Sequence, residues 1–515
     1  MTDFPVKVAA IDVGSNAMRF IAAEFLDHTA WVDLEVQRVA VRLGHQTFVT
    51  GRLDEATMTA AVATMSSFRR SLDHLGISEY RAVATSAVRE SKNGPELVER
   101  IRRECGIRLE TITGTEEARL AWLAIRSRVD LGDQPWLAMD LGGGSLEVSL
   151  ISAEGIEWTE SHPMGTVRTL ERLEGEGDPE RLRKLMTEYV QTLRIPDYTV
   201  DESVGGLLAT GGNIEALAEL AGARPDVLGC ARLPMADFAR TVEMLGAMTV
   251  RERIDELGLR EDRADVIYPA ALIYGRVAEV VGAEEILVPF VGVKEGVLID
   301  RVADLVGPRV RASHLEEQAF HGAVALGRRF HFDEAHHRHV ARLALSIFDQ
   351  LGPLHGLGAR ERRILLVAAA LHDVGQFISY RRHHKHSLYI IFNSDLPGIS
   401  EADRAMTALV ARYHRRSEPR DYHEHFRDLD PGERIVVARL TAILRLADAL
   451  DREHLQRVSV VRVRTGEEAV TLEVDGFGDL LLEHWAFEKR ARLFEAVFQR
   501  TVRFIARPPP TRGTL

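Results

Sequence analysis

The pattern of apolar and polar residues changes character once along the chain. Up to about residue 305, short apolar runs rich in β-branched residues alternate with stretches whose apolar residues recur at helical spacing, such as 54–75 and 94–105. The apolar runs read VKVAAI, RAVAT, WLAMDL, LEVSLI, GLLAT and EEILVPF. Alternating strands and helices predict an α/β fold for this part of the chain.

Beyond VGPRVRASH the strand pattern stops, and residues 315–455 predict successive helices. A last strand signal, VSVVRVRTGEEAVTLEV, predicts a hairpin that turns near GEE and precedes a helix over 484–504. The proline-rich tail RPPPTRGTL is predicted to be disordered. Four domains are expected, with the bounds 1–126, 127–308, 309–455 and 456–515.

One short pattern occurs twice in the α/β part, as VAAIDVGSNAMRFIAAE (8–24) and LAMDLGGGSLEVSLISAE (137–154). In each copy a strand leads to an aspartate, Asp12 or Asp140, and then to a turn of small residues. Such turns expose N–H groups to phosphate oxygens, and the adjacent aspartate suits a hydrated Mg²⁺. A single copy would be explained as an ordinary hairpin turn. Two copies predict two related lobes that offer phosphate-binding turns to one cleft.

Two other nucleotide-binding patterns, G-x-x-x-x-G-K-[ST] and G-x-G-x-x-G after a strand, do not occur, which argues against P-loop and dinucleotide-binding folds. A third glycine turn, LLATGGNIEAL at 207–217, follows a predicted strand and opens a helix. This arrangement presents N–H groups to an anion. A purely structural turn explains the same residues equally well.

Composition sets further limits. The 515 residues exceed what one hydrophobic core usually serves, and 45% hydrophobic with 28% charged residues is typical of a folded globular protein. The net charge of −12 argues against general attraction to nucleic acid or anionic lipid, although RRHHKH at 381–386 is a local basic run. Only Cys105 and Cys230 are present, which fits a reducing compartment. Without a signal-like N-terminus or a membrane-length apolar run, we expect a cytoplasmic protein with no membrane span.

Several segments, in this order, resemble the exopolyphosphatase and guanosine pentaphosphate phosphohydrolase (Ppx/GppA) family: AIDVGSN, ATSAVRES, ITGTEEARLAW, MDLGGGSLEV, MGTVRTLE, ATGGNIEAL and NSDLPG. LHDVGQFISYRRHHKHSLYIIFNSDLPG and LVARYHRR also look like the helical domain of its long exopolyphosphatase members. The resemblance implies two lobes of the actin, sugar kinase and Hsp70 superfamily, then an all-α HD-like domain and a small α+β C-terminal domain. It also implies an Mg²⁺-dependent exopolyphosphatase that forms a homodimer.

The resemblance assigns roles to residues of the α/β part. Glu117, the second glutamate of GTEEAR, would orient or deprotonate the attacking water. The alternative for Glu117 is a solvated acid that the helix dipole favours in the first turn. Asp140 and Glu147 match acidic positions that hold Mg²⁺, and Asp12 matches the equivalent acid of the first lobe. The phosphate-binding residues would be Ser15, Asn16, Gly143, Gly144 and Ser145.

Of two further positions, one matches the family and the other departs from it. Arg89, in ATSAVRES, matches a family arginine and would pair with phosphate oxygens through its planar guanidinium. Its alternative is a surface ion pair. The third glycine turn reads ATGGN where the family commonly has S-G-T, so the resemblance assigns it no firm contact with substrate.

In the helical part, His339, the His372–Asp373 pair and Asp448 resemble the H…HD…D order of HD-type metal phosphohydrolases. His386 and His414 fall where two-metal versions place further histidines. Imidazole and carboxylate ligands suit a first-row divalent transition metal. The alternative is an HD-like fold that binds no metal, because long exopolyphosphatases often keep this fold without the ligands.

The sequence therefore predicts an exopolyphosphatase whose partner is inorganic polyphosphate, with no nucleic acid partner. The long helical part and its basic run favour the long polymer, while pppGpp is an alternative substrate with the same phosphoanhydride chemistry. A polyphosphate- or (p)ppGpp-sensing protein with little turnover is the third hypothesis, and an intact Glu117 argues against it. Five cations are expected to bind polyphosphate, unless they are only a solvated charge run: Arg381, Arg382, Lys385, Arg415 and Arg416.

Overall fold

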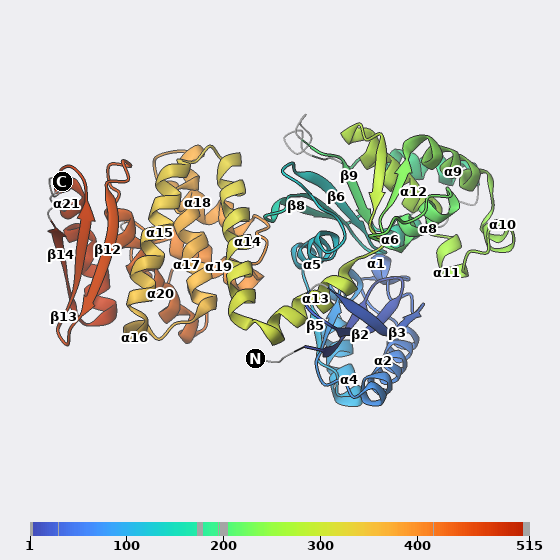
Figure 1. The fold of residues 1–515 in the computed structure, drawn as a ribbon, viewed down its shortest axis with the longest axis horizontal. Helices are drawn as coiled ribbons and strands as arrows, with labels where there is room; N and C mark the ends of the chain where they lie inside the picture. The colour runs from blue at the N-terminus through green and yellow to red at the C-terminus, as the bar shows by residue number, and fades with distance from the viewer. Residues whose placement is uncertain are drawn as a thin grey trace. The chain divides into compact units, whose positions relative to one another are not determined.

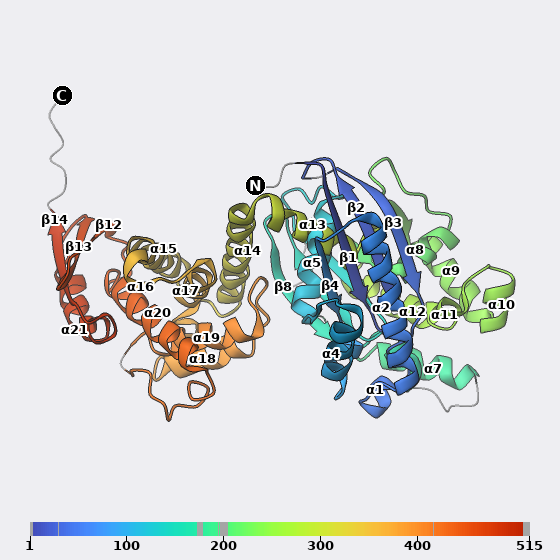
Figure 2. The same cartoon turned by 90° about the horizontal axis from the view of Figure 1, so that it is seen from below.

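The computed structural model describes residues 4–28, 30–172, 179–193, 195, 204–415 and 417–507. These residues belong to two compact units, Met1–Arg311 and Ala312–Leu515. Figure 1 shows the helices and strands of both units, and Figure 2 shows the same ribbon from below. Within the described part of the chain, no helix is both long and apolar enough to cross a membrane.

The first half of the α/β unit is built on a five-stranded mixed sheet in the order β3-β2-β1-β4-β5 (Figure 1). Strands β1 to β3 form an antiparallel meander, and β4 and β5 extend the sheet in parallel from β1. The strands are β1 (Val6–Val13), β2 (Met18–Phe25), β3 (Trp31–Val39), β4 (Tyr80–Ala84) and β5 (Leu109–Thr111).

The second half repeats this arrangement in a six-stranded sheet ordered β10-β11-β9-β6-β7-β8. Strands β6 to β8 form the meander, β9 and β11 extend it in parallel from β6, and β10 adds an antiparallel edge. The hairpins β1–β2 and β6–β7 carry the duplicated sequence pattern and hold equivalent places in their sheets. The prediction of an α/β fold is confirmed. The strands are β6 (Trp136–Leu141), β7 (Leu146–Ile151), β8 (Ile156–His162), β9 (Leu207–Thr210), β10 (Ala231–Pro234) and β11 (Glu285–Val288).

Helices cover both faces of the first sheet because side chains alternate along each strand. Ala9, Ile11 and Val13 share one core with α2 (Glu55–Leu75) and α4 (Gly94–Cys105). The helices predicted over 54–75 and 94–105 are therefore confirmed.

Helix α5 (Gly114–Arg126) joins the two halves of the unit. Its Leu120 packs in the core on the other face of the first sheet, whereas Trp122 and Ile125 pack against the second sheet. Helix α13 (Val293–Val306) packs with Leu120, and a Cβ on Gly296 would lie only 1.9 Å from the Leu120 carbonyl oxygen. The expected second lobe ends at residue 308, but its last helix contributes to the core of the first lobe.

On the other face of the second sheet lie α8 (Gly212–Leu220), α9 (Met235–Ala247) and α12 (Ile267–Val281), whose apolar residues share a core with its central strands. The unit contains six further helices among its described residues. They are α1 (Thr47–Thr50), α3 (Ser86–Glu90), α6 (Thr166–Arg172), α7 (Pro179–Val190), α10 (Val250–Asp255) and α11 (Glu261–Ala264).

The second unit is mainly helical, as the pattern over 315–455 predicts. Its helices are α14 (Pro308–Arg329), which begins within the first unit, α15 (Glu334–Gln350), α16 (Gly352–His355), α17 (Ala359–Leu371), the 3₁₀ helix η2 (Val374–Phe377), α18 (His383–Phe392), α19 (Glu401–Arg412), α20 (Pro431–Ala449) and α21 (Leu481–Phe498). Helices α15, α17, α19 and α20 share one hydrophobic core.

The C-terminal region contains the predicted hairpin, β12 (Val458–Thr465) and β13 (Ala469–Gly476). The helix expected over 484–504 is too long, because it ends at Phe498 and Gln499 adopts a left-handed conformation with φ 53°. The chain then forms β14 (Thr501–Arg507), which pairs in parallel with β13. This sheet shares its core with the helices, so the expected separate domain packs as one body with them. The tail predicted to be disordered lies beyond Arg507, outside the described residues.

Candidate functional site

A cavity of about 310 Å³ lies where the two halves of the α/β unit meet. The turns of both hairpins line it, together with the turn between β9 and α8 and the start of α13. Ser15, Asn16, Gly143 and Ser145 border the cavity, as the sequence predicts. The α/β unit therefore has the shared cleft that the duplicated pattern led us to expect.

The two hairpin turns touch each other through their glycines. A Cβ on Gly144 would lie 2.3 Å from Ser86 Oγ and 2.4 Å from Phe48 Cζ, and one on Gly143 would lie 3.1 Å from Ser15 Cβ. The hydroxyl oxygens of Ser15 and Ser86 are 3.0 Å apart. Because glycine has no side chain, the turn of the second lobe can approach the first this closely, and both turns face one cavity.

The two hairpins place charged residues at equivalent cross-strand positions. Asp12 faces Arg19 across β1–β2, and Asp140 faces Glu147 across β6–β7. Arg19 Nη1 donates to Asp12 Oδ2 at 2.9 Å, so the charges of the first pair balance. The second pair consists of two acids, and its negative charge is not balanced within the hairpin.

Burial raises the pKa values of both acids in the second hairpin. The pKa of Asp140 is raised by burial, and the hydrogen bond that its Oδ1 accepts from Thr210 Oγ1 at 2.7 Å opposes the shift. Burial and the charge of Asp140 raise the pKa of Glu147 to about 7, although Ser161 Oγ donates to its Oε1 at 2.8 Å. A raised carboxyl pKa shows that the charged form lacks a compensating partner. A divalent cation would supply it, and carboxylate oxygens are donors that Mg²⁺ prefers. Asp12 and Asp140 border the cavity and Glu147 does not, and among the described residues the three acids do not form one compact group of ligand atoms.

Glu117 lies in the first turn of α5, which Thr113 caps by accepting the N–H of Glu116 at 3.2 Å. The Glu117 side chain is buried and borders the cavity. Burial and the charge of Glu147 raise the pKa of Glu117 well above its ordinary value, while the guanidinium of Arg89, 2.5 Å from its Oε1, opposes this shift. A buried carboxyl with a raised pKa at a polar cleft is suited to accept a proton. The solvated first-turn acid is therefore excluded as an explanation.

The structure places Arg89 differently from the phosphate-binding role predicted for it. Its Nη1 donates to Glu117 and, at 2.7 Å, to the carbonyl oxygen of Ile112. Arg89 does not border the cavity. The ion pair considered as the alternative is present, but its acid, Glu117, is buried. The ends of β4 and β5 are paired, so α3, which follows β4, lies near α5, which follows β5.

Several cations of the cavity were not identified from the sequence. Arg38 pairs with Asp262, and burial lowers the pKa of Arg263. The third glycine turn also borders the cavity, and a Cβ on its Gly212 would lie 2.6 Å from Arg263 Nη2. Only Arg19 had a local signal, its position in the duplicated hairpin. The cations that line the cavity are Arg19, Arg38, Arg260, Arg263 and Lys294.

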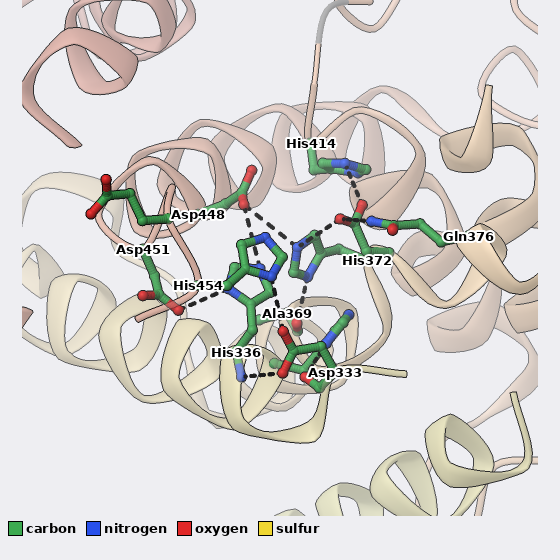
Figure 3. Close-up of polar contacts among 12 residues, drawn as sticks. Asp333, His336, Ala369, His372, Gln376, His414, Asp448, Asp451 and His454 are labelled. Carbon is green, nitrogen blue, oxygen red and sulfur yellow. Dashed lines mark hydrogen bonds and ion pairs between the residues drawn. The ribbon is translucent and has the colours of Figure 1, made fainter. Parts of the chain in front are cut away.

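A second group of polar residues lies in the helical unit (Figure 3), where His372, His414 and Asp448 are buried and Asp373 is half-buried. His372 and Asp373 follow α17, His414 follows α19, and Asp448 lies in α20, as the sequence predicts. Asp448 Oδ1 lies 3.6 Å from His372 Nε2, and Asp373 Oδ1 lies 3.0 Å from His414 Nε2. Burial lowers the pKa of His414 to about 4, so its imidazole is neutral. These four residues meet in space.

Two other predicted histidines lie one helical turn away from this cluster. Three-residue groups of ligand atoms contain His336 where we expected His339, and His383 where we expected His386. Three residues along a helix advance about 4.5 Å, so a histidine three residues away is too far along the helix to join the same ligand group. The Nδ1 of His339 instead lies 3.1 Å from the guanidinium of Arg342. Because AHHRH and RRHHKH offer histidines at both positions, spacing alone does not distinguish them.

The basic run of the helical unit divides into exposed and buried residues. Arg381, Arg382 and Lys385 are exposed where α18 begins, whereas His383 is buried between them. Arg415 borders a pocket of about 150 Å³ beside the histidine cluster. Arg416, predicted to join the same path, lies outside the described residues.

The fold and the first site define a class of protein, an α/β protein whose cleft gathers glycine turns, cations and buried acids suited to phosphate groups. Comparison with known families identifies the family. The Ppx/GppA phosphatase family matches residues 27–305, and Ppx/GppA phosphatase, domain III, matches residues 321–490. The chain therefore belongs to the Ppx/GppA phosphatase family.

Individual relatives carry two different names. The chain is 28% identical over 279 residues to Exopolyphosphatase 1 of Mycobacterium leprae, a match that covers 52% of this chain and 81% of the relative. It is 25% identical over 477 residues to guanosine-5'-triphosphate,3'-diphosphate pyrophosphatase of Aeromonas hydrophila, covering 90% and 91%. A crystal structure of an exopolyphosphatase from Cytophaga hutchinsonii matches with a TM-score of 0.54 and 30% identity, over 57% of this chain and 96% of that one.

Proposed function

We propose that this chain is an exopolyphosphatase, a phosphoanhydride hydrolase that releases terminal orthophosphate from inorganic polyphosphate. The observation that carries the proposal is the buried Glu117 at the border of a cleft lined by two glycine turns and several cations. The turns offer N–H and hydroxyl groups to phosphate oxygens. Arg263 would offset the negative charge of a chain of phosphates, and Arg19 and Lys294, which pair with Asp12 and Glu295, would add a smaller share.

The reaction asks little covalent chemistry of the protein. The oxygen of a water molecule forms a bond to the terminal phosphorus, and the bridging P–O bond breaks. Glu117 would hold this water in line and accept its proton, while positioning and charge neutralisation supply most of the rate. Arg89, through its contact with Glu117, would fix the direction of the carboxylate and favour its ionised form.

The cleft would use Mg²⁺. Asp12, Asp140 and Glu147 would hold the ion, which when bound neutralises charge on phosphate oxygens. The unbalanced acid pair of the second hairpin supports this assignment, because the acids repel each other until a cation joins them. Asp12 already has a partner in Arg19, so we expect it to contribute less to the ion than Asp140 does.

Two substrates share this chemistry. Polyphosphate is favoured because none of the described residues that line the cavity is aromatic, so no ring there would stack on a guanine base. The second candidate is pppGpp, because the relatives that match 90% to 94% of this chain are named guanosine-5'-triphosphate,3'-diphosphate pyrophosphatases. A sensing protein with low turnover is the third, and the buried Glu117 argues against it.

We also propose two actin-like lobes, an HD-like domain, a cytoplasmic location and a homodimer. The shared topology of the two sheets supports two actin-like lobes, and the helix order of the second unit supports an HD-like domain. A cytoplasmic location is supported by Cys105 and Cys230, which are both free and buried. The homodimer implied by the family resemblance is tested by light scattering of the purified chain.

One assay separates the three functions. Phosphate release is measured from polyphosphate, pppGpp and ATP at equal substrate concentration, with and without Mg²⁺. We expect the highest kcat/KM for polyphosphate and no release without a divalent cation. A higher kcat/KM for pppGpp would establish the second candidate, and tight binding without release would establish the third.

A further inference from the structure

The imidazoles of the helical cluster have fixed proton positions. The Nδ1 atoms of His372, His383 and His414 each lie 2.6–3.0 Å from the carbonyl oxygen three residues earlier in the chain. A carbonyl oxygen only accepts, so each Nδ1 carries the proton. The Nδ1 of His336 lies 2.8 Å from Asp451 Oδ2, which fixes that ring in the same way (Figure 3). In a neutral ring the Nε2 of each histidine is therefore left with a lone pair.

When both rings of the next set are neutral, three acceptor atoms face one another. Asp373 Oδ1 lies 2.8 Å from His383 Nε2 and 3.0 Å from His414 Nε2, and the two Nε2 atoms are 3.3 Å apart. A proton on Nε2 of one histidine would account for only one of the three short distances, because it can be donated along only one of them. A cation at the centre explains all three, because ligands about 2.1 Å from one ion can be up to about 4.2 Å apart.

A second set of donors adjoins the first. The Nε2 atoms of His336 and His372 are fully buried and have no hydrogen-bond partner among the described residues. Asp448 Oδ1 lies 3.8 Å and 3.6 Å from them, and Asp373 Oδ2 lies 3.9 Å from His372 Nε2 (Figure 3). These separations also fall within the span of ligands around one ion.

Asp373 belongs to both sets through its two oxygens. A carboxylate that bridges two ions in this way is suited to hold them about 3.5–4 Å apart. Outer contacts fix the ligands in place, because Asp451 accepts from His336 and Gln376 Nε2 donates to Asp373. Two sets of nitrogen and oxygen donors with one shared carboxylate define a binuclear site.

The pocket of about 150 Å³ beside these donors is also lined by arginines. Arg490 pairs with Asp448, and Arg415 lies over the ring of Tyr380, with 5.8 Å from its guanidinium carbon to the ring centroid. Arginines beside a metal pair suit the oxygens of a doubly charged phosphoryl group. The arginines that line the pocket are Arg415, Arg452 and Arg490.

We propose that the helical unit holds a binuclear centre of first-row transition metal ions that hydrolyses phosphate monoesters, with ligands His336, His372, Asp373, His383, His414 and Asp448. This activity is additional to the polyphosphate hydrolysis assigned to the α/β cleft. Imidazole and carboxylate donors select such ions, and a bound ion acidifies its water.

The reaction is a hydrolysis that needs no further reactant. Water held by the ions gives up a proton to solvent, and the hydroxide oxygen forms a bond to phosphorus. The ester P–O bond breaks, and the leaving oxygen takes a proton from water, which yields an alcohol and inorganic phosphate. The arginines would hold the phosphoryl oxygens in line.

Metal content tests the site. We expect the full chain, purified without chelators and supplied with Mn²⁺, to hold about two transition metal ions per chain. Asp373→Asn keeps the size of the side chain but removes the bridging charge, and His372→Ala with Asp373→Ala removes two ligands. Both variants should lose at least one ion. His339→Ala and His386→Ala are the matched controls and should keep both ions. No stoichiometric transition metal in the parent chain would overturn the proposal.

Activity tests the chemistry independently. Hydrolysis of p-nitrophenyl phosphate is measured with Mn²⁺ in the Glu117→Gln chain, where the cleft contributes little. Adding Asp373→Asn should lower the rate about 100-fold, whereas adding His339→Ala should not. Equal rates with and without Asp373→Asn would overturn the proposal. Faster turnover of bis(p-nitrophenyl) phosphate would overturn the assignment to monoesters.

Discussion

The cleft of the α/β unit and the cluster of the helical unit both gather buried and half-buried acids, but they surround them with different partners. In the cleft, Asp140 and Glu147 accept hydrogen bonds from hydroxyl groups. In the helical cluster, Asp373 lies among imidazole nitrogens. Oxygen donors suit Mg²⁺, whereas imidazoles suit transition metal ions. The two proposed metal sites would therefore differ in chemistry through the kind of donor that each offers.

Within the cleft, the two hairpins β1–β2 and β6–β7 also surround their acids with different partners. The two hairpins have one topology, yet one pairs Asp12 with Arg19 and the other pairs Asp140 with Glu147. The first hairpin balances its own charge, and we propose that a bound cation balances the second. Duplicated backbone geometry can thus serve two roles when one cross-strand residue changes sign.

The largest expected effect is that of Glu117→Gln. The amide keeps the shape of the side chain but cannot accept the proton of water, so kcat on polyphosphate should fall by about 10²–10⁴ with the Kd unchanged. Glu116→Gln is the matched control, because Glu116 is the neighbouring acid of the same helical turn, pairs with Arg119 and Arg81, and does not border the cavity. Near-normal turnover in Glu117→Gln would remove the role assigned to it.

The second effect separates the two hairpins. Asp140→Asn should raise the Mg²⁺ concentration needed for half-maximal activity by about 10–100-fold, since it removes a charged oxygen donor. Arg19→Gln should mainly raise the KM for polyphosphate. The measurement is a Mg²⁺ titration of phosphate release in each variant. Equal Mg²⁺ shifts in both variants would contradict the unequal roles of the hairpins.

The third effect concerns the contact between the lobes. A methyl group on Gly144 would collide with Ser86 and Phe48, so Gly144→Ala should cost about 1–3 kcal/mol in the free energy of unfolding and should lower kcat/KM. Gly142→Ala is the matched control, because its nearest neighbour would be 3.5 Å away. Urea denaturation and phosphate release check both variants. Similar losses in the two would show that the close approach at Gly144 is unimportant.

The smallest effect belongs to the basic run. Replacing Arg381, Arg382 and Lys385 together by alanine should weaken binding of long polyphosphate more than binding of short chains. The slope of log affinity against log salt concentration should also become shallower, because fewer counterions are released. Affinity is measured for chains of two lengths at several salt concentrations. An equal, small change for both lengths would indicate a merely solvated charge run.

Much of the α/β unit follows from the sequence because its signals are local. A strand, an aspartate and a glycine turn written twice predict two related hairpins, and the structure shows them at equivalent places in two sheets. Glu117 was found through its motif. Arg38 and Arg263 could not be found in this way, since they reach the cavity from segments that have no pattern of their own.

The helical unit shows where local signals fail. The segment order identifies His372, Asp373, His414 and Asp448, but the choice between His336 and His339 depends on a single helical turn. The packing of α15 against α17 and α20 decides which of the two histidines faces the cluster. The spacing of histidines along the sequence does not contain this information. Likewise the sequence predicts a helix that runs into β14, because the turn at Gln499 carries neither glycine nor proline.

The most direct measurement of the central claim is phosphate release from polyphosphate by three proteins assayed side by side. They are the parent chain, Glu117→Gln, and His372→Ala with Asp373→Ala. If hydrolysis of polyphosphate belongs to the α/β cleft, the first variant should be at least about 100-fold slower, and the second should match the parent. Near-parent release by Glu117→Gln, or an equally large loss in the helical variant, would contradict the account.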